Sequence, residues 1–130
     1  MNNKLLTGKN GEDFAQVFLI RNGYKIIERN HWKPWGELDI IARDKQGVLV
    51  IIEVKTMVVG DGGDWLKPED NLTKAKLQKV RRTALLYAGS RQDLVNNKKG
   101  SRIDLISVSL SNTLTDMSNG VDITHWENVG

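Results

Sequence analysis

The chain has 130 residues and, with 39% hydrophobic and 27% charged residues, the composition of an ordinary globular protein. A chain of this length fits a single domain, residues 1–130, with a core large enough to fold without disulfides or bound metal ions. Cysteine is absent, which excludes disulfides, thiol nucleophiles and cysteine-based metal sites, and the two distant histidines argue against a zinc cluster. The first six residues lack the apolar core of a signal peptide and no apolar run reaches membrane-spanning length, so we expect a cytoplasmic protein without a membrane partner.

The net charge of +3 is unevenly distributed along the chain. Residues 67–102 contain ten basic and three acidic residues, a local charge of +7, and the rest of the chain carries −4. A basic segment beside an acidic one is the layout of a metal site that faces phosphates. From charge alone, a solvated helix face is the simpler explanation of the basic segment.

The first predicted element is a helix over residues 7–22. Phe14, Val17 and Phe18 recur in it at helical spacing. Glu12 falls in its first or second turn, where a negative charge is stabilised by the positive end of the helix dipole. Taken by itself, Glu12 is most simply explained by this structural role.

A short strand is predicted over residues 24–30, and a turn held by Pro34 over residues 31–35. The turn carries Trp32 and Trp35, whose rings can stack on nucleobases or sugars. Tryptophans in such a position more often cap the end of a core, and this is the interpretation we prefer.

Two apolar, β-branched runs, residues 36–43 and 48–55, predict a β-hairpin. We expect a three-residue loop, residues 45–47, with its glycine in the left-handed conformation. This register places Asp39 opposite Glu53 on the same face. A loop one residue shorter or longer would send the two carboxylates to opposite faces.

Charged residues in such apolar strands need a partner, because acids and bases are rarely buried alone. Two carboxylates that face each other repel, which indicates a cation between them. Carboxylate oxygens suit Mg²⁺ or Mn²⁺, which activates a bound water and binds phosphate oxygens, so the pattern fits phosphodiester hydrolysis. Lys55, on the face of Glu53, is expected to orient the attacking water or stabilise transition-state charge rather than act as a general base.

Beyond the hairpin we expect a Gly-rich loop over residues 56–68, a long helix over residues 71–89, and strands over residues 102–110 and 121–127. The order helix, three strands, helix, two strands predicts an α/β fold, a three-layer sandwich with a mixed central sheet and flanking helices. The predicted nucleic-acid contacts are basic residues of the long helix: Lys74, Lys76, Lys79 and Arg82.

Several blocks of the sequence resemble a single protein family. They are Gly11-Glu12, Gly36-Glu37-Leu38-Asp39, Glu53-Val54-Lys55-Thr56, Arg102-Ile103-Asp104 and His125-Trp126-Glu127-Asn128. Together they closely resemble the YraN-like family, small bacterial proteins of the PD-(D/E)XK nuclease-like superfamily. The resemblance runs from about residue 7 to the C-terminus, and it implies a restriction-endonuclease-like core with Mg²⁺-dependent cleavage of DNA.

The resemblance also implies roles for five residues. By position, Asp39 and Glu53 look like the metal carboxylates, and the carbonyl of Val54 looks like a further metal ligand. Lys55 matches the motif lysine. Glu12 corresponds to the first-helix acid that some relatives, archaeal Holliday-junction resolvases among them, place near the metal.

Three functions are compatible with the sequence. The first is a metal-dependent nuclease acting on DNA, with branched or repair and recombination intermediates as candidate substrates. The second is a catalytically silent nucleic-acid-binding module, and the third is a protein-interaction or assembly factor.

Arg102 and Asp104 are expected to form an internal ion pair or a strand-edge contact. The sequence leaves open the preference for DNA over RNA and the oligomeric state, a homodimer included.

Overall fold

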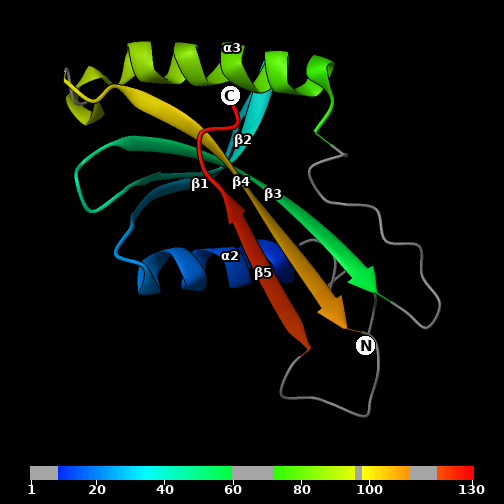
Figure 1. The fold of residues 1–130 in the computed structure, drawn as a ribbon. Coiled ribbons are helices and arrows are strands. Elements are labelled where there is room, and N and C mark those ends of the chain that lie inside the picture. The colour runs from blue at the N-terminus through cyan, green and yellow to red at the C-terminus, as the bar shows by residue number, and fades with distance from the viewer. Residues whose placement is uncertain (1–8, 60–71, 96–97, 112–119) are drawn as a thin grey trace.

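The computed structural model describes residues 9–59, 72–95, 98–111 and 120–130. Its elements in chain order are α2 (Lys9–Arg21), β1 (Lys25–Lys33), β2 (Gly36–Arg43), β3 (Leu49–Val59), α3 (Lys74–Ser90), the 3₁₀ turn η2 (Gln92–Leu94), β4 (Ser101–Ser111) and β5 (Val121–Trp126). The strands form one sheet in the order β1-β2-β3-β4-β5 (Figure 1). β3 and β4 are parallel, and all other neighbours are antiparallel.

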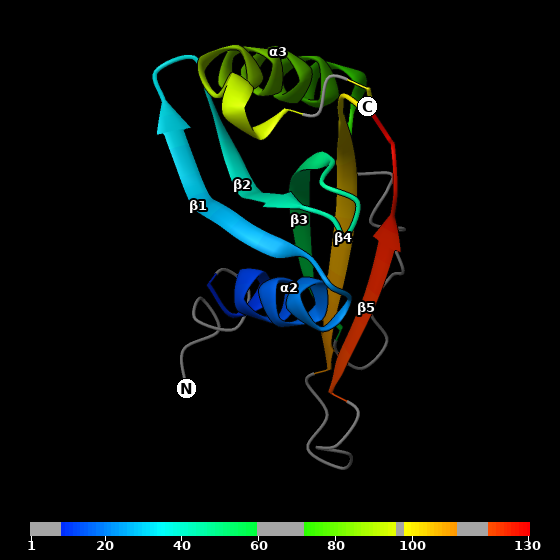
Figure 2. The same cartoon turned by 90° about the vertical axis from the view of Figure 1, so that its left-hand side faces the viewer.

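The two long helices cover opposite faces of this sheet (Figure 2). α2 packs Ala15 and Leu19 into one buried apolar cluster, and α3 packs Val80 and Tyr87 into the other. The predicted α/β three-layer sandwich with a mixed sheet is therefore confirmed. Among the described residues, no helix is long and apolar enough to cross a membrane.

The predicted turn over residues 31–35 is wrong in its extent. β1 continues to Lys33, and only Pro34 and Trp35 connect it to β2. Residues 31–33 stay paired with β2, and the ring of His31 lies edge-on to that of Tyr87 on α3, with centroids 4.9 Å apart. Local turn residues alone do not reveal such a contact.

The segment after the hairpin also differs from the prediction. β3 runs on to Val59, so the first residues of the predicted 56–68 loop belong to a strand paired in parallel with β4. The remainder of that loop lies outside the described residues. The predicted helix over residues 71–89 is present as α3, which begins after Thr73, whose side-chain oxygen accepts a hydrogen bond from the Lys76 N–H at 3.2 Å.

The register of the β2–β3 hairpin agrees with the prediction. Ile40 pairs with Ile52, and Arg43 pairs with Leu49. The Asp44 N–H donates to the Val48 carbonyl at 3.0 Å, which leaves residues 45–47 as a three-residue loop. Gly47 adopts a φ of 83°, the left-handed conformation that such a loop requires.

α2 approaches β3 closely at Gly11. A side chain at this position would overlap Thr56, so only glycine allows the helix to lie this near the strand. The next residue is Glu12. The Gly11-Glu12 pair therefore seats the helix on β3 and sets the acid beside the residues that follow Glu53.

Candidate metal and nucleic-acid site

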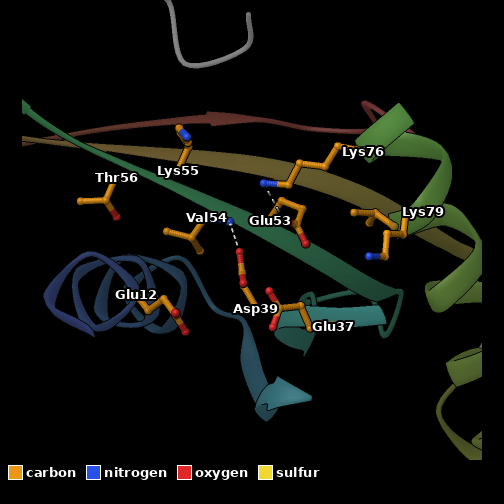
Figure 3. A pocket seen from close by; sticks show the side chains of 10 residues that line it. Glu12, Glu37, Asp39, Glu53, Val54, Lys55, Thr56, Lys76 and Lys79 are labelled. Carbon is orange, nitrogen blue, oxygen red and sulfur yellow. Dashed lines mark hydrogen bonds and ion pairs between the residues drawn. The ribbon is translucent and has the colours of Figure 1, made fainter. Parts of the chain in front are cut away.

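A cavity of about 450 Å³ opens where β2 and β3 separate (Figure 3). The β2–β3 pairing ends at Ile40 and Ile52, and beyond this point β2 stays paired with β1 while β3 stays paired with β4. Four elements contribute to the walls. The lining residues are Glu12 of α2, Glu37 and Asp39 of β2, Glu53, Val54, Lys55 and Thr56 of β3, and Lys76, Lys79 and Val80 of α3.

Asp39 lies at the fork itself. Its Oδ2 accepts a hydrogen bond from the backbone N–H of Val54 at 2.8 Å (Figure 3). The departure of β2 leaves that N–H without a ladder partner, and the carboxylate takes the place of the missing carbonyl. Burial raises the pKa of Asp39, although the Val54 hydrogen bond and Lys76 oppose the rise.

Glu53 is 6% exposed, and burial together with the nearby Asp39 carboxylate raises its pKa to about 8. The Nζ of Lys76 lies 4.0 Å from its Oε2. The Lys76 side chain is 51% exposed, so this ion pair is weak and does not compensate for the burial. The positive charge near the Glu53 carboxylate is therefore too weak to offset the cost of its burial.

Glu12 and Lys55 enter the cavity from different sides (Figure 3). The Oε1 of Glu12 lies 3.7 Å from Nη2 of Arg29. With its amide nitrogen turned toward Glu12, Asn30 donates a hydrogen bond of 2.9 Å to the same oxygen. Burial and the Asp39 carboxylate raise the pKa of Glu12 despite Arg29. Glu12 therefore belongs electrostatically to the acidic cavity.

The donor set of this cavity fits a hard divalent cation. Asp39 and Glu53 offer carboxylate oxygens in a buried place, and both have raised pKa values, which is the signature of negative charge that lacks a counter-ion. Oδ2 of Asp39 accepts a hydrogen bond from Val54, which holds this carboxylate at the cavity. Mg²⁺ or Mn²⁺, which keep several waters, would be held by these two residues.

The basic residues predicted to contact nucleic acid divide into two groups. Lys76 and Lys79 line the cavity, opposite the acids. Lys74 and Arg82 do not line it, and Arg82 lies instead beside the exposed Leu85 and Leu86 on the outer side of α3. Only the first pair is placed to face a phosphate near Asp39 and Glu53.

The sequence prediction did not include Glu37 among the site residues. Its carboxylate lines the cavity and contributes to the raised pKa of Asp39 and of Glu53. The signal was present, because residues two apart on a strand share a face and Glu37 stands two before Asp39. Glu37 is exposed, which suits a residue at the rim.

A second polar cluster centres on Asp104, which is fully buried in β4. The predicted ion pair is confirmed, with Nε of Arg102 at 3.0 Å from Oδ1. Nε2 of His125 lies 2.7 Å from Oδ2, and the Asn128 N–H donates to Oδ1 at 2.9 Å. These contacts join β4 to β5 and to the C-terminal residues, so the cluster is a structural clamp.

This clamp includes Asp104, His125 and Glu127, a trio of metal-ligand type whose ligand atoms lie within 4.8 Å of one another, and no other such trio occurs in the described ranges. Arg102 nevertheless lies 3.6 Å from Glu127 and also donates to Asp104. A guanidinium in this place supplies the positive charge that a metal ion would bring. The trio is therefore less suited to a divalent cation than the cavity at the fork.

The fold is a mixed five-stranded sheet with a helix on each face, and an acidic cavity opens where β2 and β3 separate. Residues 11–108 match the model of the uncharacterised protein family UPF0102, and the chain belongs to this family. The resemblance to YraN-like proteins is thereby confirmed.

Relatives of the family cover nearly the whole chain. A UPF0102 protein of Persephonella marina is 36% identical over 122 residues, which span 92% of this chain and 97% of that one. Another, from Dictyoglomus thermophilum, is 40% identical over 111 residues, which span 85% and 87% of the two chains.

Among solved structures, the "Structure of EndoMS-dsDNA2 complex" aligns with a TM-score of 0.40 and 14% identity. The alignment covers 81% of this chain and about a third, 35%, of that chain. At this level the likeness bears on neither the site nor its chemistry.

Proposed function

We propose that this protein is a metal-dependent nuclease that hydrolyses phosphodiester bonds of DNA, with branched or repair and recombination intermediates as substrates. The observation that carries the proposal is the meeting of Asp39 and Glu53 at the fork between β2 and β3, with Lys55 in the same cavity. A buried and a half-buried carboxylate, both with raised pKa values, are costly to a fold, and a divalent cation removes that cost.

In this proposal Asp39 and Glu53 hold Mg²⁺ or Mn²⁺, and the carbonyl of Val54 is a candidate third ligand. The cation, when bound, lowers the pKa of a water ligand and neutralises charge on the phosphate. The hydrogen bond from Val54 to Asp39 fixes the orientation of the carboxylate, which prepares it to hold a cation.

Lys55 supplies a positive charge from the strand that carries Glu53. In the proposed reaction its ammonium group orients the attacking water or stabilises the charge that develops on the phosphate oxygens. Glu12 faces the same space from α2 and is proposed to position a water between itself and Asp39. Lys76 and Lys79, across the cavity, are proposed to bind the flanking phosphates.

The test is DNA cleavage by the purified chain. Branched, single-stranded and duplex DNA are incubated with Mg²⁺, with Mn²⁺ and with EDTA, using the wild type, Glu53→Ala, Lys55→Ala and the control Lys74→Ala, whose side chain lies outside the cavity. The proposal expects cleavage that needs the metal, falls at least about 100-fold in the two site variants and is unchanged in the control.

Cleavage that survives in both Glu53→Ala and Lys55→Ala would show that the proposed site is wrong. Salt-sensitive DNA binding that is indifferent to Mg²⁺, with no cleavage of any substrate, would favour a silent binding module instead. A stable protein complex without nucleic-acid binding at low salt would favour an assembly factor.

A further inference from the structure

The turn between β1 and β2 exposes two large aromatic side chains to solvent. Trp32 is 67% exposed and Trp35 is 47% exposed, and neither belongs to the two buried clusters of the described residues. The expectation that these tryptophans cap the core is therefore wrong. The core at this end is closed instead by Leu38 and Tyr87, with the ring of His31 packed against Tyr87.

Trp32 stands next to the cavity at the fork. It pairs with Glu37 in the β1–β2 ladder. Directly opposed residues of an antiparallel pair share a face, with their Cβ atoms about 4.5–5.5 Å apart. Glu37 lines the cavity two residues from Asp39, so Trp32 stands beside a residue of the cavity rim.

The surroundings of Trp32 suit a nucleic acid better than an apolar protein surface. Lys76 and Lys79 line the neighbouring cavity from α3. An exposed indole beside a phosphate-binding cavity combines the two contacts that single-stranded nucleic acids use, a stacking surface and a positively charged track.

We propose that Trp32 is a stacking platform for an unpaired nucleobase next to the phosphate held in the cavity. The inference rests on the proposed function, since it places DNA in that cavity. An indole can stack only on a base whose face is free, and within a continuous duplex both faces of each base are covered by its neighbours. The substrate class is therefore DNA with an unpaired or terminal nucleotide beside the bound phosphate, as at a bubble, a flap or a junction.

The test measures binding without cleavage. Two dye-labelled duplexes of one sequence, one fully paired and one with four central mismatches, are titrated with the full chain in EDTA, and anisotropy gives the two affinities. The variants are Trp32→Ala, Trp32→Phe and the control Leu85→Ala, which removes an equally exposed apolar side chain, 73% exposed, from the outer side of α3.

The wild type is expected to bind the mismatched DNA more tightly than the paired DNA. Trp32→Ala should weaken binding of the mismatched DNA about 5- to 100-fold, the range of one base–aromatic stack, and leave the paired DNA within about twofold. Trp32→Phe should retain most of the preference, and Leu85→Ala all of it. Equal losses on both DNAs, or no loss on either, would overturn the inference.

The oligomeric state and the cleavage assay separate the remaining outcomes. A wild-type dimer that becomes a monomer in Trp32→Ala would place Trp32 at a subunit contact and overturn the proposal. Mismatch-selective binding that depends on Trp32, in a protein that cleaves nothing with Mg²⁺, would support the stacking site while refuting the nuclease. Metal-dependent cleavage that is unaffected by Trp32→Ala on every substrate would support the nuclease and refute the stacking site.

Discussion

The carboxylate of Asp39 accepts a hydrogen bond of 2.8 Å from the backbone N–H of Val54, at the point where β2 leaves β3. This contact does two things at once. It satisfies a backbone donor that lost its ladder partner when the strands separated. It also holds the carboxylate of Asp39 in the cavity that Glu53 lines. This cavity lies at the point where β2 and β3 separate.

The first prediction separates the structural role of the Asp39 side chain from the role of its negative charge. Asp39→Asn keeps an oxygen that can accept from Val54, so its free energy of unfolding should lie within about 0.5 kcal/mol of the wild type. Asp39→Ala leaves the N–H unpaired and should cost about 1–3 kcal/mol. Urea unfolding without metal measures both, and equal stability of the two variants would contradict the structural role.

The second prediction concerns the pH dependence of stability without metal. Burial beside Asp39 raises the pKa of Glu53 to about 8, so the protonated form is favoured by the folded state. The stability linked to this proton is fully present below about pH 4.5 and is lost as the pH rises toward 8. Glu53→Gln should therefore be more stable than the wild type at pH 8 by about 1–3 kcal/mol.

Thermal unfolding between pH 5 and pH 9 checks this prediction. Mg²⁺ should raise the melting temperature of the wild type at pH 8 and leave Glu53→Gln nearly unchanged, because the variant lacks one of the proposed ligands. A wild type whose stability does not fall between pH 5 and pH 8 would show that Glu53 is already neutralised by its surroundings.

The third prediction concerns the clamp at Asp104. Asp104→Asn removes the buried negative charge that contacts Arg102 and His125. It should lower the free energy of unfolding by about 3–5 kcal/mol at pH 7. Hydrogen bonds from His125, the Asn128 N–H and Arg102 outweigh burial and lower the pKa of Asp104. Its contribution is thus present above the unfolded-state pKa of about 3.9 and is lost as the pH falls through the lower folded-state value.

Asp93→Asn is the matched control for Asp104→Asn, and urea unfolding measures the stability of both variants. Asp93 pairs with Arg91 at 3.1 Å, as Asp104 pairs with Arg102, but its side chain is 64% exposed. The control should unfold at the same urea concentration as the wild type. Similar losses in the two variants would contradict the view that burial makes the Asp104 network important.

The fourth prediction concerns the basic wall of the cavity. If Lys79 faces a phosphate, Lys79→Gln should reduce the slope of the logarithm of DNA affinity against the logarithm of salt concentration by about 0.9. Lys74→Gln, which alters a lysine of the same helix outside the cavity, should leave the slope nearly unchanged. Equal changes in the two variants would indicate a diffuse basic helix face instead of a phosphate site.

Much of the hairpin could be predicted from sequence because its determinants are local. Gly47 fixes the loop through its left-handed conformation, and the alternation of apolar residues fixes the register. The register puts Asp39 and Glu53 on one face, although the ladder ends at Ile40 and Ile52, one residue before them. The prediction that Lys55 shares their surroundings follows from the same period of two.

Other features depend on contacts that are distant in sequence. The end of β1 contacts Tyr87 of α3, and the partner of Asp104 in β5, His125, is 21 residues away. The exposure of Trp32 depends on which residues close the core at that end, and a turn sequence does not contain this information. Period-two reasoning puts Glu37 on the face of Asp39, but this placement alone does not assign Glu37 a role in the site.

The measurement that tests the central claim most directly is a crystal structure of the wild type grown with Mn²⁺, whose anomalous scattering locates the ion. The account predicts a peak between the carboxylates of Asp39 and Glu53, with Mn–O distances of about 2.0–2.3 Å. The peak should be absent in Asp39→Asn. A peak at Asp104, His125 and Glu127, with none at the fork, would contradict the account.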